Sequence, residues 1–283
     1  MPRLTLPDGQ ILHYEDDDFT DPWDHRPVLF LQHGNGRSGR FWWRCMPGLL
    51  PYFRVVRPDM RGVGQSSRPA DPVAGITIEQ CVDDLVRLIG HCAGGAPVFF
   101  CGESMGGILG MALAAQRPDL VRALCLVATP VYINQNMKDR YALGYPSRLD
   151  AMRGMGLEQW VRVTSQDARL PHEQEPELFD WYVREYAKGD PDILIRYSDL
   201  VNGANATTLL PAIQCPTRAI FPSNGPITDR TQEDLLRQGI KGVDIAHLPS
   251  DYHMIHLSHP RECAELIAGF FLQQEIGDKS TQP

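Results

Sequence analysis

The first half of the chain alternates between short apolar runs and segments with helical periodicity. Four runs end in turn residues and have the length of buried strands: 27–34, 53–62, 96–102 and 121–129. A helix is expected from residue 77 to 92, where apolar residues recur about every 3.6 positions, and a Gly/Ala-rich helix from Met105 to about Gln116. This order predicts an α/β protein whose mostly parallel sheet has helices on both faces.

The helix expected at 77–92 carries its own start signal. Thr77 is followed three residues later by Gln80, which is the pattern of a capping box. One face of this helix is apolar and consists of Ile78, Cys81, Val82, Leu85, Leu88 and Ile89. We expect that face to pack against the sheet.

The rhythm of strands breaks between about Pro130 and about Pro211. Tyr, Trp, Met and charged residues mix there in helical spacing, and strand, helix, strand and closing helix return afterwards. We therefore predict an α/β core formed by residues 1–130 and 211–283, interrupted by a helical cap at 131–210.

Composition restricts the classes of function. The chain has 283 residues, 43% of them hydrophobic, and a net charge of −8 without any basic run. A nucleic-acid partner is therefore not expected, and neither is a membrane partner, because no apolar segment is long enough for a span or a secretion signal. The seven cysteines are scattered without C-x-x-C spacing, which favours free thiols in a reducing compartment, so we expect a cytoplasmic protein.

The candidate chemistry starts at the junction between an expected strand and an expected helix. Residues 102–106 read Gly-Glu-Ser-Met-Gly, a G-x-S-x-G motif. In this context Ser104 is expected on a tight, strained turn that exposes its hydroxyl beside the first free N–H groups of the helix. The simpler alternative is that Ser104 only caps the helix.

Two further stretches favour catalysis. His33-Gly34-Asn35-Gly36 follows the strand that includes residues 28–32, and "PDMRGVGQS" occupies 58–66. His253 comes before the last helix, with Pro260 seven residues later. With these motifs the chain resembles the α/β-hydrolase superfamily over nearly its full length.

The resemblance implies a set of roles. Ser104 would be the nucleophile and His253 the general base, with the backbone N–H groups of Asn35 and Met105 as the oxyanion hole. His256 and His259 are rival bases. A metal site at these three histidines is not expected because no carboxylate or cysteine cluster accompanies them. His33, Asp59 and Arg61 are expected to hold loops in place.

The third member of the triad departs from the family pattern. Gly225 stands where relatives usually carry an aspartate, and the strand end at 124–136 has no acid either. Asp229 is our candidate for the acid. A Ser-His dyad, steadied by a neutral group such as Asn224, is the alternative.

Aromatic residues suggest the substrate pocket. The resemblance places Trp42 and Trp43 near the substrate cleft, although at least one of the two is expected in the core. Among the aromatic residues of the predicted cap, Trp181 is our candidate for the pocket lining. The prediction is a serine hydrolase that acts on a small, mainly apolar ester or lactone and uses no metal or organic cofactor. Alternatives on this fold are a carbon–carbon bond hydrolase, a cofactor-free lyase or oxygenase, and a ligand-binding receptor or pseudoenzyme. The sequence does not indicate an oligomeric state.

Overall fold

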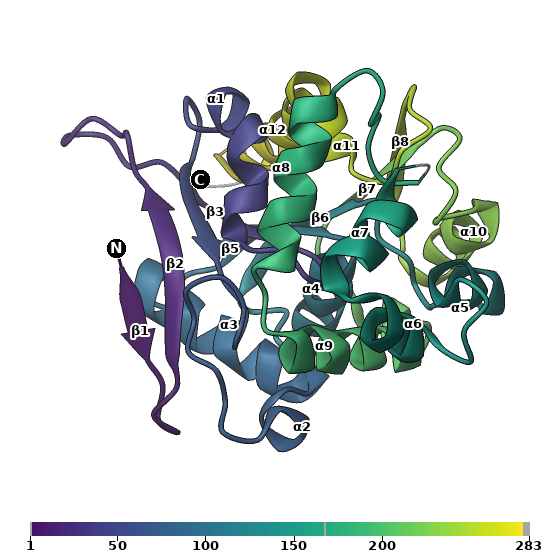
Figure 1. Cartoon of the computed structure of the whole chain (residues 1–283). Helices are drawn as coiled ribbons and strands as arrows, with labels where there is room; N and C mark the ends of the chain where they lie inside the picture. The colour runs from purple at the N-terminus through teal and green to yellow at the C-terminus, as the bar shows by residue number, and fades with distance from the viewer. Residues whose placement is uncertain (1, 167, 280–283) are drawn as a thin grey trace.

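A computed structural model describes residues 2–166 and 168–279, with side chains as far as residue 275. The centre of the molecule is an eight-stranded sheet with the order β1-β2-β4-β3-β5-β6-β7-β8. Strand β2 pairs antiparallel with β1 and with β4, and the other neighbours are parallel, which confirms the predicted fold class (Figure 1). The strands are β1 Arg3–Thr5, β2 Ile11–Asp17, β3 Val28–Gln32, β4 Arg54–Pro58, β5 Val98–Glu103, β6 Val121–Val127, β7 Thr217–Pro222 and β8 Asp244–Leu248.

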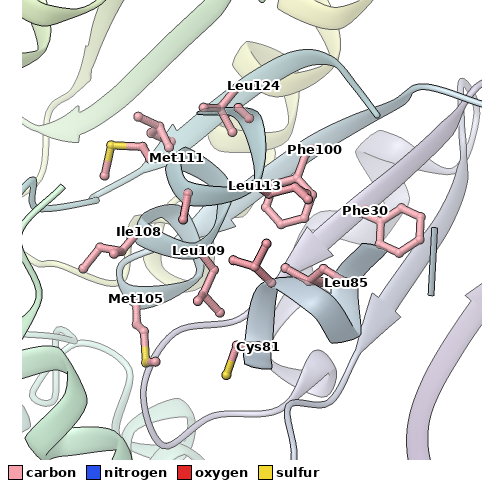
Figure 2. Packing of buried hydrophobic residues seen from close by; sticks show 14 of the residues in the cluster. Phe30, Cys81, Leu85, Phe100, Met105, Ile108, Leu109, Met111, Leu113 and Leu124 are labelled. Carbon is pink, nitrogen blue, oxygen red and sulfur yellow. The ribbon is translucent and has the colours of Figure 1, made fainter. Parts of the chain in front are cut away.

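Helices cover both faces of this sheet. The helices outside the cap are α1 Met46–Leu49, α2 Pro72–Gly75, α3 Ile78–Ala93, α4 Met105–Gln116, α10 Arg230–Gly239, α11 Ile255–Ser258 and α12 Pro260–Lys279, with 3₁₀ turns η1 Gly39–Cys45 and η2 Leu210–Ala212. Side chains of β5 alternate between the two covered faces, so that Phe100 packs with α3 and α4 while Phe99 packs with α12. Figure 2 shows the first of these clusters, in which Phe100 lies close to Leu113.

Helix α3 shows how local signals and packing act together. The Thr77 side chain accepts a hydrogen bond from the Gln80 N–H at 3.1 Å, as the capping pattern predicts. The Gln80 side chain instead donates to Asp84, so only half of the capping box forms. Cys81 and Leu85 of the predicted apolar face are buried against α4 (Figure 2).

The segment between β6 and β7, which includes the predicted cap, is helical. Its helices are α5 Gln135–Ala142, α6 Arg148–Met155, α7 Leu157–Ser165, α8 Pro176–Ala187 and α9 Pro191–Gly203. They form one contiguous group, coloured teal to green in Figure 1. A bridge between Tyr132 and Asn205 joins the two ends of this segment. Trp160 and Tyr182 of the cap pack in one cluster with Phe41 and Met254 of the core.

The sheet order creates a crevice where the site can form. From β3 the chain moves to β4 on one side and later to β5 on the other. In open α/β sheets, ligands bind beyond the carboxyl ends of strands at such a switch point. The loop at 33–36 and Ser104 follow β3 and β5 directly, so both lie at this edge.

No helix in residues 2–166 and 168–279 is both long and apolar enough to cross a membrane.

Candidate active site

Ser104 occupies a strained turn between β5 and α4. Its φ of 52° and ψ of −117° are values that side-chain-bearing residues rarely adopt. The turn is possible only with small neighbours, because a Cβ on Gly102 would lie 2.3 Å from the carbonyl oxygen of Gly106. A Cβ on Gly106 would likewise lie 2.4 Å from the carbonyl oxygen of Gln32. The two glycines of the motif therefore let β5, α4 and β3 approach closely at the serine.

Two backbone N–H groups remain available beside Ser104. Met105 is the first residue of α4, so its N–H has no acceptor within the helix. The N–H of Asn35 also finds no acceptor in the part of the chain that the structure describes. The loop that carries Asn35 is fixed, because the Gly34 N–H donates to the Glu103 carboxylate at 3.1 Å and the Asn35 side chain donates to Ser198.

His253 lies in the loop between β8 and α11 and is buried. It lines the same small cavity as Ser104 and Asn35. Its Nε2 is 3.4 Å from Oε1 of Glu103, while its Nδ1 is buried without a hydrogen-bond partner. Burial lowers the pKa of His253, and the Glu103 carboxylate only partly opposes this effect. The imidazole is therefore neutral at pH 7 and has one nitrogen free to accept a proton.

The other histidines are placed differently. The His256 ring packs against Trp42 in a tilted arrangement at a centroid distance of 4.6 Å, and burial lowers the pKa of His256 to about 4. His259 pairs with the Ser258 hydroxyl. Both ring nitrogens of His33 are engaged with backbone groups. None of these three contributes to the cavity at Ser104.

Glu103, the second residue of the G-x-S-x-G motif, is the carboxylate that lies next to His253. It is fully buried and forms a bidentate ion pair with Arg37, at 2.7 and 2.9 Å from Nη2. Burial alone would raise the pKa of Glu103, but Arg37 and His253 outweigh it and hold that pKa well below its ordinary value. The sequence pattern does not single out Glu103, because its position in the G-x-S-x-G motif is variable. A carboxylate at the end of an otherwise apolar strand was the available signal.

The structure does not bring Asp229 to His253. Asp229 is the N-cap of α10 and its carboxylate accepts a hydrogen bond from the Gln232 N–H. Asn224, the neutral alternative, donates to the exposed Asp251. Gly225 has no room for a side chain either, because a Cβ there would lie 2.3 Å from the Pro222 ring. The loop after β7 is thus occupied by turn and cap contacts of its own.

The predicted aromatic pocket residues lie outside the cavity. Both tryptophans belong to η1, where the Trp42 side chain is fully buried in the core and the Trp43 side chain is 48% exposed. Trp181 packs on Phe41 at a centroid distance of 5.0 Å. Trp42 therefore follows the expectation that one of the neighbouring pair is core, and neither Trp43 nor Trp181 reaches Ser104.

The cavity itself is small and more polar than expected. Its volume is about 30 Å³, room for about two water molecules, so a substrate must displace or separate parts of its wall. The lining residues are Asn35, Arg37, Ser104, Pro130, Ile133, Met137, Tyr141, Arg148, Arg169, Val201, Ile227 and His253. Three of them are arginines, which does not suit the mainly apolar substrate predicted from the sequence. Within the described residues, no group of three potential metal ligands occurs.

Comparison with known proteins finds hydrolases of the same fold among the similar sequences and structures. A family model described as the alpha/beta hydrolase fold matches residues 27–260. A pimeloyl-[acyl-carrier protein] methyl ester esterase of Neisseria meningitidis is 27% identical over 86% of this chain and 92% of its own. A putative carbamate hydrolase, RutD, of Klebsiella pneumoniae is 25% identical over 84% and 88%. The crystal structure of the enol-lactonase from Burkholderia xenovorans superposes with a TM-score of 0.84 at 24% identity, covering 96% of this chain and all of that one.

Proposed function

The chain belongs to the alpha/beta-hydrolase fold family, and we propose that it is a serine hydrolase that cleaves a small carboxylic ester or lactone through an acyl-enzyme on Ser104. The observation that carries the proposal is the strained turn at Ser104, beside two free backbone N–H groups and a neutral, buried His253. A strained backbone conformation costs on the order of 1–3 kcal/mol, which a protein that only binds a ligand has no reason to retain. The names of the esterase and hydrolase relatives support the same reaction class.

In the first step, Ser104 attacks the carbonyl carbon of the ester. The serine hydroxyl is too weakly acidic to do this unaided, so the imidazole of His253, which lines the same cavity, accepts its proton as the new C–O bond forms. The carbonyl oxygen becomes an oxyanion, which the N–H groups of Asn35 and Met105 stabilise. His253 then returns the proton to the departing alcohol. Water repeats the sequence on the acyl-enzyme and releases the acid.

Glu103 takes the position of the missing acid in this proposal. Its carboxylate lies 3.4 Å from Nε2 of His253 and stabilises the imidazolium that forms during attack. Arg37 keeps Glu103 ionised and in place. Glu103 is thus a positioning residue that acts through His253.

A phosphonate label tests the nucleophile. A fluorophosphonate probe should modify the wild-type protein once, at Ser104, and the protein should turn over a chromogenic short-chain ester. Both signals should vanish in Ser104→Ala and persist in Ser258→Ala, a matched serine outside the cavity. Labelling that survives Ser104→Ala would contradict the proposal, and a folded protein with neither labelling nor turnover would favour the receptor alternative.

A further inference from the structure

Two arginines of the cap reach the cavity, and no carboxylate among the described residues balances their charge. Arg148 begins α6, and Arg169 lies between α7 and α8. They are only 5% and 4% exposed, and both line the cavity with Ser104. Among residues 2–166 and 168–275, neither guanidinium forms an ion pair with a carboxylate. The Nε of each is buried and has no hydrogen-bond partner.

The remaining contacts of these guanidiniums are with aromatic rings and a phenol. Arg148 and Arg169 lie 4.7 and 5.0 Å from the centroid of the same Tyr141 ring. Arg148 is also 5.0 Å from the Trp160 ring, and Arg169 donates to the Tyr182 hydroxyl at 2.9 Å. These contacts hold both groups in position but do not neutralise them.

The other buried arginines of the described chain are paired. Five arginines of the described chain are buried, and three of them lie outside the cap. Each of these three forms an ion pair with a carboxylate: Arg37 with Glu103, Arg57 with Asp17, and Arg61 with Asp84. Removing a charge from water without a partner is strongly unfavourable. Arg148 is further disfavoured because it stands at the N-terminus of α6, where the helix dipole repels a cation. Nothing in the fold itself accounts for two unpaired cations here.

We propose that Arg148 and Arg169 bind a carboxylate of the substrate, so that the enzyme hydrolyses monoesters or lactones of dicarboxylic acids. This inference rests on the proposed function and names its substrate class. The planar guanidinium matches a carboxylate with two parallel hydrogen bonds, and one such anion would balance part of the positive charge of the cavity. Addition of one water to a monoester would give a dicarboxylate and an alcohol, and addition of one water to a lactone that carries a carboxylate would give a single ring-opened hydroxy dicarboxylate.

Backbone hydrogen bonds connect the proposed carboxylate site, formed by Arg148 and Arg169, to the loop of the proposed base His253. The N–H of His253 donates to the carbonyl of Ala168 at 2.8 Å, and the N–H of Met254 donates to the carbonyl of Arg169 at 3.1 Å. These two bonds hold the segment that carries Arg169 against the loop that carries His253. A substrate bound through its carboxylate is therefore placed at a fixed offset from the base.

The kinetic test compares charged and neutral esters of matched length. Monoethyl succinate and monoethyl glutarate should be hydrolysed with a kcat/KM at least about tenfold above that of ethyl butanoate and ethyl pentanoate. In Arg148→Met and Arg169→Met this charged-to-neutral ratio should fall by about 10- to 100-fold, the strength of a charge-assisted hydrogen bond, mainly through KM. Arg162→Met is the control, since Arg162 is a cap arginine paired with Asp180 outside the cavity. It should leave the ratio unchanged.

A binding test works even without turnover. Succinate at millimolar concentration should raise the melting temperature of the wild-type protein and of Arg162→Met, but not of Arg148→Met. A protein that is labelled at Ser104 yet shows no preference for half-esters and no shift with succinate would overturn the carboxylate site and leave the proposed function intact. A shift with inorganic phosphate but not with succinate would also overturn it. A succinate shift without any ester hydrolysis would uphold the anion site and contradict the hydrolase.

Discussion

The core side and the cap side of the cavity differ in whether their buried charges are paired. On the core side, Arg37 and Glu103 neutralise each other and His253 is neutral. On the cap side, Arg148 and Arg169 have aromatic neighbours, and the described part of the chain offers them no counter-charge. A region that is electrostatically complete can be preorganised for chemistry before any ligand arrives. We infer that a bound substrate supplies the missing negative charge on the cap side, with reactivity located in the core and substrate choice in the cap.

The largest expected effect on activity comes from removing the proposed general base on the core side of the cavity. His253→Ala should reduce kcat by about a thousandfold or more, because the serine then has no proton acceptor. His256→Ala is the matched control, since it removes a buried imidazole that packs against Trp42 and does not line the cavity. Steady-state kinetics on a neutral ester would measure both. A comparable loss in His256→Ala with an active His253→Ala would reverse the assignment.

The next effect concerns the acid. Glu103→Gln should reduce kcat by roughly 100-fold, because the amide cannot stabilise the imidazolium as a carboxylate does. Asp229→Asn should remain close to wild type, since Asp229 only caps α10. Circular dichroism should confirm that both variants are folded. If Asp229→Asn instead lost most of its turnover, the loop after β7 would have to rearrange during catalysis.

A smaller effect is expected from aromatic residues of the cap. Tyr141 lies beneath both arginines and lines the cavity, whereas Trp181 packs on Phe41 outside it. Tyr141→Leu should change the relative kcat/KM among half-esters of different chain length by about tenfold, while Trp181→Leu should change it by less than about threefold. Equal effects of the two substitutions would mean that the substrate extends to the outer aromatic cluster.

The smallest expected effect is a shift in the pH dependence of activity, because charged groups from both sides of the cavity act on the pKa of His253. The base must be neutral, and burial lowers its pKa below the ordinary 6.5, so kcat/KM should persist below pH 6.5 and fall as the pH drops through the lowered value. Glu103 raises this pKa whereas Arg37 and Arg169 lower it. Arg169→Met should therefore move the acidic limb of the pH profile upward, and Glu103→Gln should move it downward. Shifts in the same direction for both variants would contradict this account.

The sequence predicted the half of the site that depends on local backbone geometry. Ser104 and Met105 follow from the glycines on either side of them, because only small residues fit where β3, β5 and α4 meet. His253 was placed by its position before the last helix. The acid could not be predicted in the same way, because Glu103 meets His253 across 150 residues of chain and the motif gives its position no meaning.

What the sequence by itself determined is the alternation of strands and helices, the elbow at Ser104 and the helical nature of the cap, all of which depend on neighbouring residues. Only the tertiary structure decided which buried charges have partners. Arg37, Arg148 and Arg169 look alike in the sequence, yet among the residues that the structure describes only Arg37 of these three meets a carboxylate. The physical reason is that the free energy of a buried charge depends on which groups surround it in space. That environment is assembled from segments far apart along the chain.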